Sequence, residues 1–160
     1  MKLIIPYRLK SSRFPNKYIS DFLGLPLIEH SLKLCEEFGN DVIVTAPKED
    51  YVKEVSDLQD HYGFQFIPTS LDCKTGTDRV MEISRNIRDD YYIMIPADEP
   101  LILKEELKLT LEKIAKIKGV KLEKANFLFI CEDLSNLSEY ARQIDNSTFK
   151  ILKRNLPGPY

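Results

Sequence analysis

The fold is decided by the stretch IIPYRLKSSRFPNK, residues 4–17, near the start of the chain. It begins within a short apolar run, Leu3–Ile5, which is long enough for one buried strand, and then changes abruptly into a polar loop. The loop has no acidic residue before Asp21. Its cationic side chains are Arg8, Lys10, Arg13 and Lys17. A cationic loop directly after a strand is typical of an α/β sheet that binds an anion beyond the carboxyl ends of its strands.

The chemistry of this loop suits a polyphosphate. Arginine presents a planar fork of donors and lysine a point charge, so together they can clamp a triphosphate and stabilise charge on a transferring phosphoryl group. The alternative is an ordinary solvated loop, because runs of like charge are common on protein surfaces. The loop lacks the glycines of a Walker loop and of a dinucleotide-binding fingerprint, which excludes both motifs.

The overall composition is that of an ordinary globular protein. Of the 160 residues, 43% are hydrophobic and 30% are charged, and the formal net charge is −2. This length suits one domain, and this balance excludes a disordered, membrane-embedded or generally nucleic-acid-binding chain. No apolar run approaches the roughly 20 residues that cross a bilayer, so we expect a cytoplasmic protein with neither nucleic acid nor membrane as a partner. Three scattered cysteines argue against a disulfide framework and against a zinc site.

Strands and helices are expected to alternate along the chain. The strands are expected at residues 3–5, 41–46, 64–67, 91–95 and 125–131, and the helices at 27–37, 48–62, 77–87 and 105–118. A turn at 21–26 precedes the first helix, Thr77 is the expected cap of the third, and a hairpin joins 140–144 to 148–152. This alternation predicts an α/β fold with a mostly parallel sheet, flanking helices and right-handed crossovers.

Carboxylates follow the strand expected at 91–95, in the segment Pro96-Ala97-Asp98-Glu99-Pro100. The carboxyl end of a buried strand is the usual place for a ligand or metal group in such a sheet. Either acid suits magnesium, which takes oxygen ligands and reaches proteins through one or two carboxylates together with substrate phosphates. The alternative is a turn, or an acid that caps the following helix.

Several stretches taken together resemble the cytidylyltransferases that activate 3-deoxy-manno-octulosonate, a sugar acid of bacterial lipopolysaccharide. Residues 5–17 are similar to the family's opening I-P-A-R-x-x-S-x-R-L-P-x-K, and residues 24–28 to G-K-P-[LM]-I. Residues 75–79 resemble S-G-T-[DE]-R, and residues 96–102 resemble Q-G-D-E-P-[LM]-I. Residues 153–157 are a fainter match to S-R-x-x-I-P. Within these motifs, Tyr7 stands in place of a small residue, Pro96 in place of glutamine and Ala97 in place of glycine.

The resemblance implies a Rossmann-like nucleotidyltransferase fold of the nucleotide-diphospho-sugar transferase type, with residues 1–160 as one domain that lacks the family's C-terminal part. It implies transfer of CMP from CTP to 3-deoxy-manno-octulosonate or a similar sugar acid, with Mg²⁺ as the cofactor and pyrophosphate as the leaving group. By the resemblance, the triphosphate would be held by Arg8, Ser11, Arg13 and Lys17. Thr77 and Arg79 would help to hold the nucleotide, and Asp98 would bind magnesium. The catalytic residues would be Arg13, Lys17 and Asp98.

Two other functions stay open at this stage, as does assembly into a homodimer. One is a non-catalytic nucleotide-binding or assembly module that keeps the fold without turnover. The other is a nucleotidyltransferase of the same fold that uses another sugar or nucleotide, because Tyr7 and Pro96 depart from the motifs next to the expected site.

Overall fold

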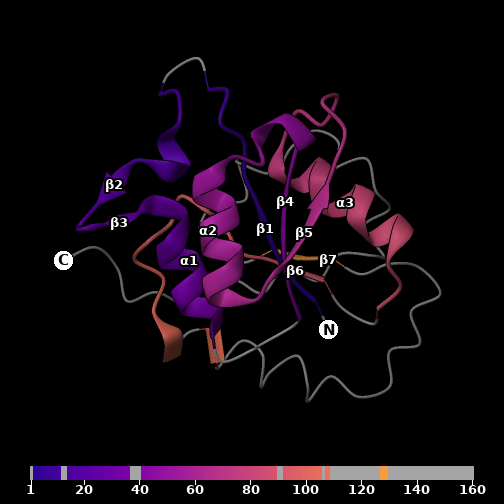
Figure 1. Cartoon of the computed structure of the whole chain (residues 1–160). Coiled ribbons are helices and arrows are strands. Elements are labelled where there is room, and N and C mark those ends of the chain that lie inside the picture. The colour runs from indigo at the N-terminus through magenta and orange to yellow at the C-terminus, as the bar shows by residue number, and fades with distance from the viewer. Residues whose placement is uncertain are drawn as a thin grey trace.

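The computed structural model describes residues 2–11, 14–36, 41–89, 92–105, 107–108 and 127–129 (Figure 1). The expected strand at 125–131 is described only at 127–129, and most of the expected helix at 105–118 lies outside the described residues. The hairpin expected at 140–152 and the motif at 153–157 lie entirely outside them.

Five of the described strands form one sheet in the order β5-β4-β1-β6-β7. They are β1 (Lys2–Pro6), β4 (Val42–Ala46), β5 (Gln65–Pro68), β6 (Tyr92–Met94) and β7 (Phe127–Phe129). Every neighbouring pair is parallel, with Leu3 opposite Val42 on one side of β1 and opposite Ile93 on the other. The Rossmann-like α/β fold with a mostly parallel sheet is therefore confirmed. Strands β1 and β4 consist of near-continuous apolar runs, which is typical of strands covered by helices on both faces.

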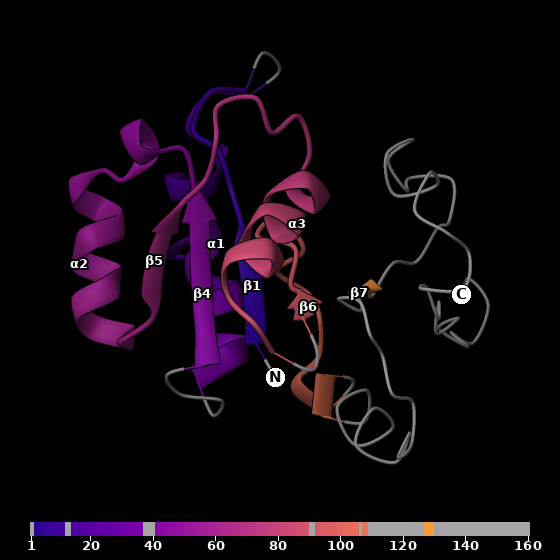
Figure 2. The same cartoon turned by 90° about the vertical axis from the view of Figure 1, so that its right-hand side faces the viewer.

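Helices pack on the two faces of the sheet, and alternate residues of β1 face them. Leu3 and Ile5 belong to the core cluster that includes residues of α1 (Leu27–Cys35) and α2 (Lys53–Tyr62). Ile4 points the other way and packs in a second cluster with residues of α3 (Gly76–Asn86). Figure 2 shows α3 in front of the sheet and α1 behind it. All three core residues of β1 have 0% exposure, so this strand is the centre of the fold.

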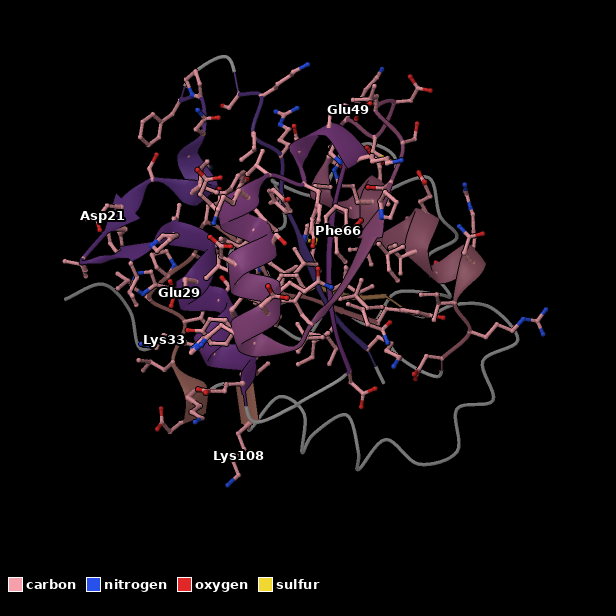
Figure 3. The ribbon with its side chains drawn as sticks, viewed as in Figure 1. Asp21, Glu29, Lys33, Glu49, Phe66 and Lys108 are labelled. Atoms are coloured by element: carbon pink, nitrogen blue, oxygen red, sulfur yellow. The ribbon has the colours of Figure 1, made fainter. Side chains whose placement is uncertain are left out.

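Contacts between side chains join the outer elements. The Tyr62 hydroxyl donates to Glu29 Oε1 at 2.8 Å and so ties α2 to α1, and Glu29 is labelled in Figure 3. The rings of Tyr51 and Phe66 lie 4.4 Å apart between centroids, which links the segment before α2 to β5. Among the described residues, no helix combines the length and the apolarity needed to span a membrane.

The turn expected at residues 21–26 is confirmed: it is a hairpin of β2 (Asp21–Phe22) and β3 (Leu25–Pro26) around positive φ angles at Leu23 and Gly24. Two other local expectations were wrong in detail. The helix expected from residue 48 begins only at Lys53, after a short 3₁₀ turn, η3 (Lys48–Asp50). The reason is tertiary: Asp50 is turned inward, where its carbonyl and carboxylate accept hydrogen bonds from the loop after β1.

The expected cap of α3 was wrong by two residues, because Thr75 caps the helix and not Thr77. The Thr75 side chain accepts a hydrogen bond from Asp78 N at 3.2 Å, and Asp78 Oδ2 accepts one from Thr75 N at 2.8 Å. This reciprocal pair is a capping box, which satisfies two backbone donors at once. Gly76 follows within 3.0 Å of Pro6 Cγ, measured from where a Cβ would lie, so α3 begins against the end of β1.

We expect Thr75→Ala to lower the free energy of unfolding by about 1 kcal/mol, because it removes the capping oxygen from the first turn of α3. Urea denaturation followed by circular dichroism measures this difference. Thr75→Ser is the matched control, since it keeps the oxygen and should stay close to the parent protein. Equal losses in the two variants would show that the capping oxygen is not the stabilising group.

Candidate functional site

The candidate site lies where the strand order of the sheet reverses. From β1 the chain proceeds outward to β4 and β5 on one side, and then returns to form β6 on the other side. In such sheets, ligands bind in the crevice outside the carboxyl ends of the strands at this switch point. The loops that follow β1, β4 and β5 gather at the same end of the sheet (Figure 2). The hydrogen bonding between β1 and β6 extends one residue beyond β6, because Ile95 N donates to Ile4 O at 2.8 Å.

The loop after β1 and the loop after β6 meet in an ion pair. Lys17 Nζ lies 2.5 Å from Asp98 Oδ2, although the two residues are 81 positions apart in the chain. Both side chains are partly open to solvent, at 29% and 41% exposure. Partial burial lowers the pKa of Lys17, but its hydrogen bond and charge interaction with Asp98 outweigh this and raise the pKa above its ordinary value. The structure thus brings together the predicted phosphate-loop lysine and the predicted metal carboxylate.

Helix α1 supports the loop that carries Asp98 through a hydrogen bond. Ser31, a buried residue of α1, donates from its hydroxyl to Pro96 O at 3.0 Å. Ala97 is also buried, at 1% exposure, whereas Asp98 and Glu99 are exposed. The chain therefore emerges from the core at Asp98, and the hydrogen bond to Pro96 O and the burial of Ala97 fix where this carboxylate begins.

Tyr18 is a component of the site that the sequence reasoning missed. The Lys17 ammonium lies 4.7 Å from the centroid of the Tyr18 ring, within the range of a cation–π interaction. Burial and the charge of Asp98 raise the pKa of the Tyr18 hydroxyl, while the charges of Lys17 and Arg8 act in the opposite direction. The neutral Tyr18 side chain thus lies next to the charged groups at the sheet edge. Its position next to Lys17 in the sequence was the only signal.

Two hydrogen bonds to the buried residue Asp50, together called the brace at Asp50, anchor the start of the cationic loop to the segment after β4. The Tyr7 hydroxyl donates to Asp50 O at 2.7 Å, and Leu9 N donates to Asp50 Oδ2 at 2.9 Å. Burial, and then the charge of Asp50, raise the pKa of Tyr7 above its ordinary value. Tyr7 also packs its ring edge-on to that of Tyr18, at 6.2 Å between centroids. Asp50 was not predicted, because a lone acid in an expected helix carries no signal of such a contact.

The other residues predicted for the phosphate loop lie along the same segment. Arg8 is exposed, and the Ser11 hydroxyl accepts a hydrogen bond from Phe14 N at 3.3 Å. Arg13 lies outside the described residues. The loop closes through a hydrogen bond from Asn16 N to Leu9 O at 2.9 Å, with Asn16 in the left-handed region at φ 57°. The chain reversal at Asn16 returns Lys17 to the sheet edge.

Thr77 and Arg79 are both buried, at 7% and 3% exposure. The Arg79 guanidinium donates to the Thr69 hydroxyl at 2.8 Å and to the carbonyls of Ser70 and Cys73 at 3.1 and 3.3 Å. It thereby fixes the loop after β5. Within the described part of the chain, Arg79 takes part in no ion pair, and its hydrogen-bond acceptors are neutral oxygens. A buried cation of this kind favours an anion nearby.

The described residues contain no group of three or more His, Cys, Asp or Glu side chains that could hold a metal ion. A metal at Asp98 would thus depend on further ligands. Magnesium is commonly bound in this way, because substrate phosphates complete its coordination.

Comparisons with known proteins agree on one family. A family model described as "Cytidylyltransferase" matches residues 3–160. The 3-deoxy-manno-octulosonate cytidylyltransferase of Chlorobium phaeobacteroides is 28% identical, over 99% of this chain and 64% of its own length. That of a Nitratiruptor species is 31% identical, over 94% of this chain and 60% of its own length.

A solved structure, of a CMP:2-keto-3-deoxy-manno-octonic acid synthetase complexed with CTP, is similar to this chain with a TM-score of 0.60 at 28% identity. The similarity covers 72% of this chain and 47% of that one. The chain thus spans about 60 to 64% of the length of these two curated relatives.

We expect Asp50→Leu to lower the free energy of unfolding by about 1 to 3 kcal/mol, because it leaves the buried Leu9 N–H without its acceptor. Urea denaturation measures the loss. Asp50→Asn keeps an oxygen that can accept this bond, so its loss should be clearly smaller. If the asparagine variant were as unstable as the leucine variant, the charge of Asp50 and not its hydrogen bond would be the stabilising feature.

Proposed function

Because the chain belongs to the cytidylyltransferase family, we propose that it binds CTP with magnesium and transfers CMP to a sugar acid, releasing pyrophosphate. The acceptor we propose is 3-deoxy-manno-octulosonate or a close analogue, after the names of the relatives. The proposal treats residues 1–160 as one α/β domain of this family.

One observation carries the proposal: a cationic loop and a carboxylate meet at the switch point of a parallel sheet. The ion pair of Lys17 with Asp98, at 2.5 Å, joins the loop after β1 to the loop after β6. Cations from one strand end suit phosphates, and a carboxylate from the neighbouring strand end suits a metal that the phosphates share. The similar structure with CTP bound supports CTP as the nucleotide.

The phosphates would be held by residues of the loop after β1. We assign Arg8, Ser11, Arg13 and Lys17 to the triphosphate, and Thr77 and Arg79 to the nucleotide. The buried charge of Arg79, which has only neutral oxygen partners among the described residues, supports an anion on that side of the site. The first turn of α3 begins against Pro6 at the end of β1 and adds the positive end of a helix dipole.

Asp98 would hold the metal. Its partly exposed carboxylate fits a hard cation that takes oxygen ligands. Among the described residues there is no group of three or more His, Cys, Asp or Glu side chains around it, which fits a metal that arrives with the nucleotide. When bound, magnesium neutralises charge on the phosphates and draws electron density from phosphorus.

The chain's own residues would bind and orient the reactants. A hydroxyl of the sugar acid attacks the α-phosphorus of CTP, forming a new phosphorus–oxygen bond as the bond to the β-phosphate oxygen breaks. Pyrophosphate leaves with that electron pair, and the hydroxyl proton passes to solvent. Arg13 and Lys17 would stabilise the charge that grows on the phosphates, so no nucleophile from the protein is required.

Calorimetric titration with CTP, ATP, GTP and UTP, each with and without Mg²⁺, tests the binding step. We expect magnesium-dependent binding with a preference for CTP, and in Asp98→Asn we expect the magnesium dependence to disappear. Absence of binding to all four nucleotides would contradict the proposal. A variant that kept the full dependence would show that the metal is bound elsewhere.

We expect Arg13→Ala to weaken CTP binding by about 1.5 to 3 kcal/mol, because it removes a hydrogen bond between two charged groups. Lys10→Ala is the matched control, since Lys10 is an exposed cation of the same loop with no assigned role. Equal affinity losses in the two variants would indicate a general electrostatic effect and not a specific phosphate contact.

Release of pyrophosphate from CTP and 3-deoxy-manno-octulosonate tests catalysis. We expect release that requires both substrates and Mg²⁺ and that is lost in Asp98→Asn. Tight binding of CTP without pyrophosphate release, across a panel of sugar acids, would favour the non-catalytic binding module.

A further inference from the structure

Lys17 and Asp98 would each bind a different part of the substrate complex, yet in the structure they bind each other. We propose that Lys17 and the metal ion compete for the Asp98 carboxylate, and that Tyr18 is a positioning residue that keeps Lys17 on it until phosphates draw the lysine away. This inference rests on the proposed function. It adds that metal binding and nucleotide binding are coupled, so that each favours the other.

The first step is the occupancy of Asp98. Lys17 Nζ lies 2.5 Å from Asp98 Oδ2, a short charge-assisted contact. Magnesium binds a carboxylate oxygen at about 2.0 to 2.1 Å, so a metal on either oxygen of Asp98 would lie only a few ångströms from the ammonium group. Two cations at that separation repel each other. In the nucleotide-free protein, Lys17 therefore opposes metal binding.

The second step is the seat of the lysine. The Tyr18 ring lies 4.7 Å from Lys17 Nζ and attracts the ammonium group through its π electrons. That ring packs edge-on against Tyr7, and the Tyr7 hydroxyl donates to Asp50 O at 2.7 Å. A continuous set of buried and half-buried contacts thus links the position of Lys17 to the segment after β4. Because the Tyr18 ring is itself packed, it restricts the position of the ammonium group on the flexible Lys17 side chain.

The third step is release. At 29% and 41% exposure, the ion pair lies close enough to solvent to be weak, so a polyphosphate with several charges can replace the single carboxylate as the partner of Lys17. When Lys17 moves to the phosphates, Asp98 becomes free for the metal, and a metal on Asp98 frees Lys17 for the phosphates. Each ligand therefore favours the other, and the coupling is reciprocal.

Calorimetric titration with metal-free CTP in EDTA tests the competition. We expect Asp98→Asn to raise the affinity about 2- to 5-fold, the range for loss of an exposed ion pair, because it frees Lys17. In a Lys17→Met background, the same change should give almost no gain. An equal gain in both backgrounds would mean simple repulsion between Asp98 and phosphate, and would overturn the inference, as would no gain in either.

A second measurement uses Mn²⁺ alone and therefore stands even if the protein binds no nucleotide. Mn²⁺ broadens amide resonances near its site, and Ala97 and Glu99 flank Asp98. We expect Lys17→Met to lower the Mn²⁺ concentration for half-broadening about 2- to 5-fold, Lys10→Met to change nothing, and Asp98→Asn to abolish the broadening. Unchanged broadening in Lys17→Met, or no broadening near residue 98 in any variant, would overturn the inference.

Two variants test the positioning role of Tyr18 in the Mn²⁺ measurement. Tyr18→Phe keeps the ring but removes the hydroxyl, which also interacts with Lys17, so its Mn²⁺ response should shift less than that of Tyr18→Leu. Tyr18→Leu should reproduce part of the shift seen in Lys17→Met. A merely structural role would lower stability in Tyr18→Leu and leave the Mn²⁺ response unchanged, which would overturn this assignment.

Discussion

The parallel pairing of β1 with β4 on one side and with β6 on the other is the constraint on which the rest of the structure depends. Parallel strands point in the same direction, so the loops that leave β1 and β6 emerge at the same edge of the sheet. Residues 3–5 of β1 have no exposure, and a slip by one residue would move each of them from one closely packed cluster into the other, where it does not fit. The register therefore determines where the two loops begin, and it brings Lys17 to Asp98.

Polar contacts then carry the rigidity of the sheet into the cationic loop. Asp50 is buried at 5% exposure and accepts from the loop at both its carbonyl and its carboxylate. A buried donor without its acceptor is costly, so alternative loop conformations that break these bonds are disfavoured. Tyr7 adds its ring contact with Tyr18, which itself lies against Lys17. Through these contacts the core restricts the positions that a solvent-facing cation can take.

The charges at this edge fit the chemistry of the cytidylyltransferase family. Arg79 is buried and held in place by neutral oxygens, and Lys17 is paired with Asp98, so both cations have defined positions at the carboxyl end of the sheet. Donors that are already positioned stabilise developing charge better than groups that must reorganise during the reaction. Before the substrate binds, the ion pair of Lys17 with Asp98 also neutralises the charges of its two partners.

The sequence by itself determined the alternation of strands and helices, the cationic loop and the carboxylate at a strand end, because apolar periodicity and local composition encode these features. The motifs were also sufficient to indicate the family. Local detail was less accurate where two nearby residues compete, as with the cap at Thr75 or Thr77. Only the tertiary structure decided the strand order, the pairing of Lys17 with Asp98, the brace at Asp50 and the bonds of Arg79. The pairing and the brace join residues 81 and 41 positions apart, and no local pattern specifies contacts that form only when distant strands come together.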